Sequence, residues 1–152
     1  MQTCNLLDDR VLSSRKRKEA AMRGVTREHV SERMQECIDN CLECHAACLE
    51  TLIYSLQQGG GHAEENHIRL LLDCAEICQT SANFMLRNSP LHAITCAACA
   101  EVCERCAVEC ERFPDDMQMA ACARMCRKCA DSCKEMAATG TLTGDRGALP
   151  AS

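Results

Sequence analysis

Four stretches of the chain carry the hydrophobic pattern of amphipathic helices. They cover residues 26–57, 62–87, 90–112 and 114–138, are rich in Ala, Glu, Leu, Arg and Met, and have no internal proline or glycine. These features predict α-helices. Because the connections between them are short, neighbouring helices are expected to run antiparallel, which predicts an all-α, up-down-up-down four-helix bundle.

The residues between these stretches are typical of turns and helix ends. Gly59-Gly60-Gly61 is the strongest helix breaker in the sequence. Thr26 is expected to cap the first helix, Ser89-Pro90 to open the third, and Pro114 with the two acids after it to open the fourth. The chain is therefore expected to divide into three parts: an N-terminal arm or short helix (1–25), the bundle (26–138) and a flexible C-terminal tail (139–152).

Cysteine occupies the positions of the pattern where leucine is usual in a bundle. Fifteen of the sixteen cysteines follow one another at intervals of three or four residues within the predicted helices, and only Cys4 lies outside this stripe. Such intervals mark the a and d positions of a heptad, which face the centre of a bundle. The cysteines of the stripe are Cys37, Cys41, Cys44, Cys48, Cys74, Cys78, Cys96, Cys99, Cys103, Cys106, Cys110, Cys122, Cys126, Cys129 and Cys133.

Composition adds three points to this picture. Three aromatic residues and no tryptophan leave little bulk for a core, so cysteine, which packs as a small hydrophobic residue, is expected to fill it. The N-terminal segment has no apolar run and nothing in the chain is long enough to span a membrane, so we expect a cytoplasmic protein. Thiols stay reduced there, and dense cysteine then indicates metal binding or catalysis. The net charge of −5 gives no reason to expect nucleic acid as a partner.

The pentapeptide CLECH, Cys41–His45, matches the signature for covalent haem attachment. Its two cysteines, however, belong to the longer stripe, haem attachment normally requires export, and few aromatics are present to build an apolar haem pocket. His45 lies one position off the stripe and is expected on a flank or at an interface. The stripe therefore argues against haem.

Zinc, iron–sulfur clusters and disulfides are the other readings of so many cysteines. Four thiolates from facing helices would suit zinc, but structural zinc sites and iron–sulfur clusters usually take their cysteines from turns or loops. None of the striped cysteines lies at a predicted turn. Disulfides are disfavoured in a reducing compartment. A buffer for zinc or another thiophilic metal remains an alternative function.

Cu(I) is the ion that best suits an interior lined with thiolates. Soft sulfur ligands select it, and two cysteines three or four residues apart on one helix face can clasp an ion while bridging sulfurs link successive ions. A Cu(I) ion held by two thiolates that bind no other ion leaves a buried negative charge, which is costly. Sharing of thiolates until copper and sulfur approach equal numbers makes the interior neutral. The expected capacity is therefore on the order of the number of core cysteines.

With this stripe on all four helices, the sequence resembles the bacterial copper storage proteins, the Csp family. The resemblance spans residues 26–138 and implies a four-helix bundle that holds many Cu(I) ions, assembles as a homotetramer and serves copper storage or detoxification. Without a signal peptide, the chain resembles the cytosolic branch of the family. The C-x-x-x-C pairs that match the family motif are Cys37/Cys41, Cys44/Cys48, Cys74/Cys78, Cys99/Cys103, Cys106/Cys110, Cys122/Cys126 and Cys129/Cys133.

Extending the stripe beyond the cysteines locates the two ends of the predicted bundle. One end gathers soft ligands suited to the capture and hand-over of copper: Met34, Met85, His92 and Met136. The other end is bulkier and includes two further candidate ligands, His67 and Met119. The second helix has few cysteines on its stripe, so copper capacity is expected to be lower along that wall.

The main alternative from another class is a thiol-based redox enzyme. Such an enzyme needs a cysteine of low pKa near a base, at a helix N-terminus or in a C-x-x-C motif. Cys96-x-x-Cys99, near the start of the third helix, is the best candidate. The leading hypothesis is Cu(I) storage without catalysis.

Overall fold

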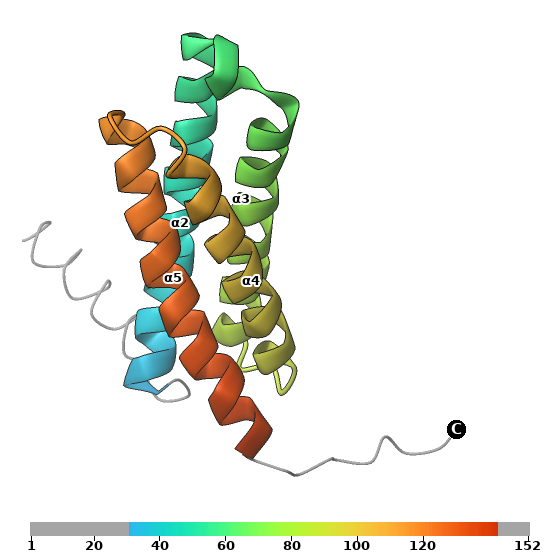
Figure 1. Cartoon of the computed structure of the whole chain (residues 1–152). Helices are drawn as coiled ribbons and strands as arrows, with labels where there is room; N and C mark the ends of the chain where they lie inside the picture. The colour runs from blue at the N-terminus through green and yellow to red at the C-terminus, as the bar shows by residue number, and fades with distance from the viewer. Residues whose placement is uncertain (1–30, 143–152) are drawn as a thin grey trace, which may run out of the picture. The chain divides into compact units, whose positions relative to one another are not determined.

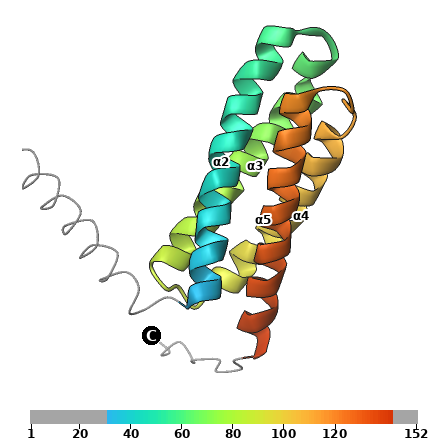
Figure 2. The ribbon, with the colours of Figure 1, turned by 90° about the vertical axis from the view of Figure 1, so that its left-hand side faces the viewer.

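The computed structural model describes residues 31–142, and within that range it contains helices and no strands. Four long helices alternate in direction, and the connections that join them lie at the two ends (Figure 1). Figure 2 shows the same four helices side by side from another direction. The predicted up-down-up-down bundle is confirmed. The elements are α2 (Glu32–Gln58), the short 3₁₀ helix η1 (Gly60–Ala63), α3 (Glu65–Leu86), α4 (His92–Cys110) and α5 (Met117–Leu142).

The connection between α2 and α3 differs from the prediction. A helix was expected from residue 62, but η1 occupies Gly60–Ala63 and α3 begins only at Glu65. Gly59 and Gly60 have φ angles of 71° and 55°, a left-handed conformation that only glycine adopts at little cost. The glycines therefore do more than end α2. They turn the chain so that the residues after them form a separate short helix.

The third and fourth helices also begin later than predicted. The Ser89 hydroxyl accepts the backbone N–H of Leu91 at 3.2 Å, so Ser89 and Pro90 form a turn and α4 begins at His92. In front of α5, the Asp116 carboxylate accepts two backbone N–H groups, those of Gln118 at 2.9 Å and Met119 at 3.0 Å. Asp116 is thus the capping residue, and Pro114 precedes the helix.

The ends of the predicted segments fall partly outside the described residues. Thr26, the expected first cap, and the N-terminal arm lie outside them, as does Cys4. At the other end, α5 continues through Gly140 to Leu142, beyond the predicted end at residue 138. A single glycine in a helix costs only about 1 kcal/mol relative to alanine, which is too little to stop the helix there.

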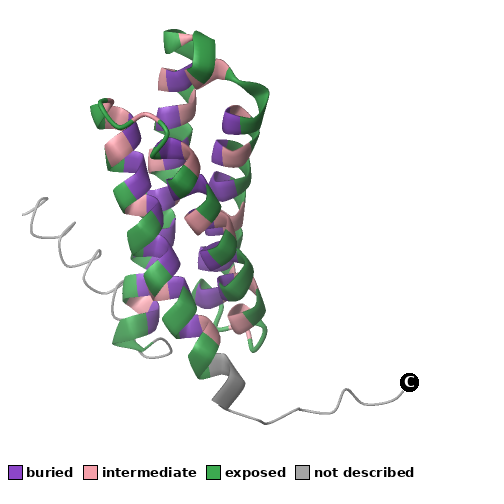
Figure 3. Ribbon diagram, viewed as in Figure 1, coloured by how far each residue is buried: buried purple, intermediate pink, exposed green. Residues whose placement is uncertain are grey.

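The cysteine stripes of the helices form the interior of the bundle. All fifteen striped cysteines are 1% exposed or less, and Figure 3 shows the buried positions on the inner faces of the helices. Alanines flank the stripe on α4 and α5 and are buried as well: Ala100, Ala107, Ala123 and Ala130. Protonated thiols pack as small hydrophobic groups, so the core needs no large side chains. The expectation that cysteine fills the core is confirmed.

The outer surface contributes less to stability than this core. Arg127 of α5 forms a two-pronged ion pair with Glu111, with the closest contact at 2.8 Å, and Lys134 pairs with Glu104 of α4. Exposed pairs of this kind each contribute about 0–1 kcal/mol. None of the described helices combines the length and the apolar character needed to cross a lipid bilayer.

The reduced, metal-free protein is expected to be strongly helical already. The helix caps and the thiol packing do not depend on metal. Circular dichroism at 222 nm of protein reduced and freed of metal should therefore change little when Cu(I) is added. A random-coil spectrum that becomes helical only with metal would contradict this expectation, because it would indicate folding coupled to metal binding, as in zinc fingers.

Candidate metal centre

The buried thiols form a continuous column along the interior of the bundle. All fifteen are free, and neighbouring sulfur atoms lie 3.5–4.0 Å apart, as for Cys41 and Cys133 at 3.5 Å and Cys44 and Cys74 at 4.0 Å. Disulfide sulfurs are separated by only about 2.05 Å. The column is therefore a set of separate thiols in van der Waals or weak hydrogen-bonding contact, each with a sulfur available as a ligand.

Most of the thiols gather into groups that are compact enough to hold a metal ion. Among the described residues, five groups of sulfur atoms lie within 4.8 Å of one another. Each group takes its thiols from three different helices, and most of the thiols belong to more than one group. The groups are Cys41, Cys99, Cys129 and Cys133; Cys44, Cys48, Cys74 and Cys126; Cys44, Cys74, Cys78 and Cys103; Cys78, Cys99, Cys103 and Cys129; and Cys37, Cys96 and Cys133. Shared thiols are what bridging between neighbouring ions requires.

Four of the five groups contain both members of a C-x-x-x-C pair, but the shortest sulfur contacts mostly join different helices. Of the close sulfur contacts in the described region, one joins the two members of such a pair, Cys99 and Cys103 at 3.8 Å. The others cross between helices, as from Cys78 to Cys103 at 3.5 Å. The reason is geometric. Residues four apart on a helix have Cβ atoms about 5–6 Å apart, whereas the inward-pointing sulfurs of adjacent helices approach more closely.

Burial and mutual contact raise the pKa of one thiol near each end of the column, Cys96 and Cys110. For Cys96, a hydrogen bond with Cys133 lowers the pKa, but the contact with Cys37 and burial outweigh it and raise the pKa to about 11. The pKa of Cys110 is raised by its contacts with Cys106 and Cys122 and by burial. These thiols are protonated near neutral pH without metal. A metal that binds there must displace the proton.

The four candidate ligands at one end of the bundle lie where the sequence placed them. We call this the methionine end; α2 and α4 begin there, and α3 finishes there. Met34, Met85 and Met136 are buried, and the Cys96 thiol lies 3.7 Å from the Met85 sulfur. His92 is half-buried, and its Nδ1 lies 2.8 Å from the carbonyl oxygen of Ser89, within its own turn. Met85 thus extends the sulfur column, while the His92 ring is held beside it.

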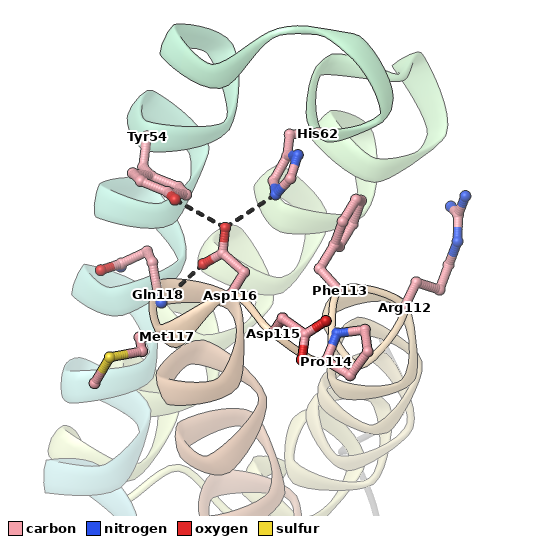
Figure 4. Close-up of a pocket in the computed structure, with 9 residues that line it drawn as sticks. All are labelled: Tyr54, His62, Arg112, Phe113, Pro114, Asp115, Asp116, Met117 and Gln118. Atoms are coloured by element: carbon pink, nitrogen blue, oxygen red, sulfur yellow. Dashed lines mark hydrogen bonds and ion pairs between the residues drawn. The ribbon is translucent and has the colours of Figure 1, made fainter.

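The opposite end is closed by aromatic side chains, and we call it the aromatic end. His67 and Met119 are fully buried there. The Phe113 ring packs edge-on against His67, with ring centroids 5.3 Å apart, and stacks against His62 at 4.0 Å. Outside these rings lies a surface pocket of about 780 Å³ that includes Tyr54 and Asp116 (Figure 4).

Asp116 is the centre of a hydrogen-bond network at the aromatic end. Its Oδ2 accepts the Tyr54 hydroxyl at 2.8 Å and lies 3.0 Å from Nε2 of His62, and Figure 4 shows both side chains directed at this carboxylate. Burial acts to raise the pKa of Asp116, but these bonds and the N–H groups at the start of α5 outweigh it and hold the pKa below its usual value. The same bond to Asp116 raises the pKa of Tyr54.

Several residues have roles that the sequence did not indicate. His62 lies on η1, outside every helical stripe, so periodicity gives no signal for it, and Asp116 was recognised only as a helix-opening acid. His45, the histidine of CLECH, lies on the flank of α2 as the sequence predicted, with Nδ1 2.8 Å from the Ala75 carbonyl of α3. It ties two helices together away from the thiols. Cys106, Cys110 and Cys122 are buried near the aromatic end but belong to none of the five groups.

Comparison with known proteins agrees with this geometry. A sequence profile described as copper storage protein (Csp) matches residues 30–138. A crystal structure of a protein from Nitrosospira multiformis is 44% identical, covers 71% of this chain and 97% of its own, and superposes with a TM-score of 0.67. The Cu(I)-bound copper storage protein BsCsp3 of Bacillus subtilis is 35% identical, with 70% of this chain and 99% of that chain covered and a TM-score of 0.66.

Two further relatives have the same character. The copper storage protein Ccsp from Streptomyces lividans, loaded with 10 copper equivalents, is 30% identical over 70% of this chain and 85% of its own, with a TM-score of 0.62. The cysteine-rich protein YhjQ of Bacillus subtilis is 36% identical over 82 residues, which are 54% of this chain and 76% of that protein. The fold, the buried thiol column and the profile match over most of the chain agree, and the chain belongs to the copper storage protein family.

Proposed function

We propose that this protein stores many Cu(I) ions in the thiol column at the centre of its bundle. The observation that carries the proposal is the set of fifteen free, fully buried thiols, most of them in overlapping groups of three or four. A site for one metal ion needs no more than four of them. Two related proteins, BsCsp3 and the Streptomyces Ccsp, are described as Cu(I)-bound and as loaded with several copper equivalents.

The charge balance of the column favours Cu(I) over a divalent ion. A divalent ion with four private thiolates carries a net charge of −2, and burying that charge is costly in a core made of sulfur and alanine. Cu(I) accepts two or three thiolates and tolerates bridging. Because seven of the twelve grouped thiols belong to two groups, bridging lets the number of ions approach the number of thiolates. The interior then stays neutral.

The same features speak against the thiol redox enzyme. A catalytic cysteine must be reachable and must have a lowered pKa. Cys96 and Cys99, the C-x-x-C pair, are fully buried, and the pKa of Cys96 is raised to about 11. We therefore assign the protein a binding and storage role without catalysis.

We also assign the protein to the cytosol and to a homo-oligomer, a tetramer by family resemblance. The Streptomyces relative is described as a cytosolic copper storage protein. The outer face of α2 supports self-association, because Leu49, Ile53 and Leu56 are exposed on it and their spacing places them on one side of the helix. Copper ions and further copies of the chain are the partners proposed; nucleic acid and membranes are not.

Parallel anaerobic titrations with Cu(I) and Zn(II) test this function against a zinc buffer. Because Zn(II) keeps private ligands in structural sites, it can fill only thiol groups that share no member, and at most three of the five groups meet this condition. We expect no more than about three Zn(II) ions per chain, all displaced by Cu(I), when metal is counted after desalting. Zn(II) binding that equals Cu(I) binding in number and resists displacement would instead support the zinc buffer.

A further inference from the structure

The aromatic end of the bundle is built in layers. The innermost layer is His67, which is fully buried on the inner face of α3. Phe113, from the connection between α4 and α5, covers it with ring centroids 5.3 Å apart. The third layer is His62 of η1, whose ring lies 4.0 Å from that of Phe113 and is nearly parallel to it, at 29°. Two separate connections thus supply the layers that cover one helix residue.

Two side chains from other elements hold the outer layer in place. Asp116 caps the start of α5, and its carboxylate lies 3.0 Å from Nε2 of His62. Tyr54 of α2 donates its hydroxyl to the same carboxylate oxygen at 2.8 Å. We call Asp116, Tyr54 and His62 the latch. It joins the end of α2 and η1, which are neighbours in sequence, to the distant start of α5, and its bonds are visible in Figure 4.

The segment that carries His62 is joined to α2 through glycines in a left-handed conformation. Gly59 and Gly60 precede it with positive φ angles, and no atom lies within 4 Å of a Cβ added at either position. Gly61 lies against Phe113, since a Cβ there would be 3.7 Å from the ring. η1 therefore rests on Phe113 but is attached to α2 through open, conformationally free residues.

His67, beneath Phe113, has a ring nitrogen without a hydrogen-bond partner. Nδ1 of His67 is buried and has no hydrogen-bond partner, and the nearest carboxylate oxygen, on Glu109, is 3.7 Å away. A buried polar atom without a partner costs about 1–3 kcal/mol, and water at this position would relieve that cost. The rings of Phe113 and His62 keep water away. Burial also lowers the pKa of His67, although Glu109 opposes this shift.

We propose that the latch holds Phe113 over His67 as a plug and so keeps the aromatic end of the thiol column shut to metal ions. When the latch opens, His67 becomes the first ligand that an ion meets on this side, with Met119 and Cys110 behind it. The proposal rests on the storage function above, and it gives the two ends different roles. At the methionine end, Nδ1 of His92 lies 2.8 Å from the Ser89 carbonyl oxygen of its own turn, whereas His62 is held by a carboxylate from another element.

The first test needs no copper. Hydrogen–deuterium exchange at C2 of each histidine ring, read by mass spectrometry on reduced, metal-free protein, reports how well water reaches His67. We expect His67 to be strongly protected in the native chain. His62→Ala removes the stacked ring and the bond to Asp116 and should speed His67 exchange more than about tenfold. Tyr54→Phe keeps its ring and loses one hydrogen bond, so the expected gain is roughly three- to tenfold.

A matched control and a check on folding accompany this test. Phe84→Ala truncates a half-buried phenylalanine at the opposite end of the bundle, where Arg87 lies 4.0 Å above the ring, much as Arg112 lies near Phe113. It should leave His67 exchange unchanged. Circular dichroism shows whether each variant stays helical. If His62→Ala unfolds, Tyr54→Phe provides the test of the latch. Exchange of His67 in the native chain as fast as in a free peptide, or equal exchange in all variants, overturns the plug.

The second test asks whether the plug controls metal. Copper-loaded protein is mixed with a strong Cu(I) chelator, and the rate of removal is followed by stopped flow. His62→Ala should speed removal several-fold, and replacing His67 with leucine in that variant should cancel the gain. If His67 exchange rises while copper rates do not change, the plug is mere packing and the proposal fails. A protein that binds no copper would fail the storage function alone, since the exchange test would still stand.

Discussion

Reduced, metal-free protein is expected to bind Cu(I) in a number on the order of its fifteen buried thiols before free copper appears. The physical reason is neutrality: each ion replaces one proton, and bridging thiolates let copper and sulfur approach equal numbers. The measurement is an anaerobic titration against a chromophoric Cu(I) chelator, with protein and bound copper quantified independently. Saturation at one or two ions per chain would reject storage.

Paired variants test whether the capacity resides in the shared thiols. Cys44 and Cys74 each belong to two of the five groups. Replacing both with alanine should lower the copper capacity by about two to four ions, because the remaining thiols of those groups cannot supply the missing negative charge. The matched control is Ser81→Ala, a small buried side chain on α3 that supplies no thiol. It should leave the number bound unchanged. An equal loss in both variants would point to a general packing defect.

Copper loading and removal are expected to slow markedly when the methionine end loses its soft ligands. The variant replaces Met34, Met85 and Met136 with leucine and His92 with phenylalanine, which keeps the apolar volume roughly constant and should preserve the fold. Thioether and imidazole groups hold Cu(I) more loosely than thiolates and need no deprotonation, so they suit transfer of ions inward. Capacity should change by only a few ions, because the thiols set it.

Stopped-flow loading beside an equilibrium titration separates the rate from the capacity. Met117→Leu is the control, since Met117 is 87% exposed outside the column and its loss should change neither quantity. Unchanged rates in the fourfold variant would show that copper passes elsewhere, most directly past His67 and Met119. If the fourfold variant does slow removal, adding His62→Ala should restore fast removal, because the latch then no longer closes the aromatic end.

The sequence predicted the features that depend on periodicity. Cysteines at intervals of three and four can face one way only on a helix, and all fifteen are buried together, with Met34, Met85 and Met136 at the end expected for an antiparallel bundle. The features that depend on local turn geometry were harder to predict. Ser89 forms a turn three residues before the start of α4, and the left-handed glycines produce η1 where a longer α3 was expected.

The latch lay beyond sequence reasoning for a different reason. Asp116 lies 62 residues from Tyr54 and 54 residues from His62 in the sequence. No spacing rule connects a helix, a glycine-rich connection and a capping residue. Similarly, the grouping of thiols across three helices depends on the rotation of each helix about its axis. A heptad pattern gives the inward face, but it leaves open which sulfurs meet.

An exchange of one proton for each Cu(I) ion in the thiol column has a consequence for how the protein behaves in solution. If every Cu(I) ion enters as one proton leaves, the net charge of −5 is the same for the empty and the full molecule. The isoelectric point, the mobility in an electric field and the mutual repulsion between copies then do not depend on the amount of metal carried. Because the exchange also takes place wholly inside the bundle, a second molecule that recognises the outer surface by its charges meets the same surface at every stage of filling.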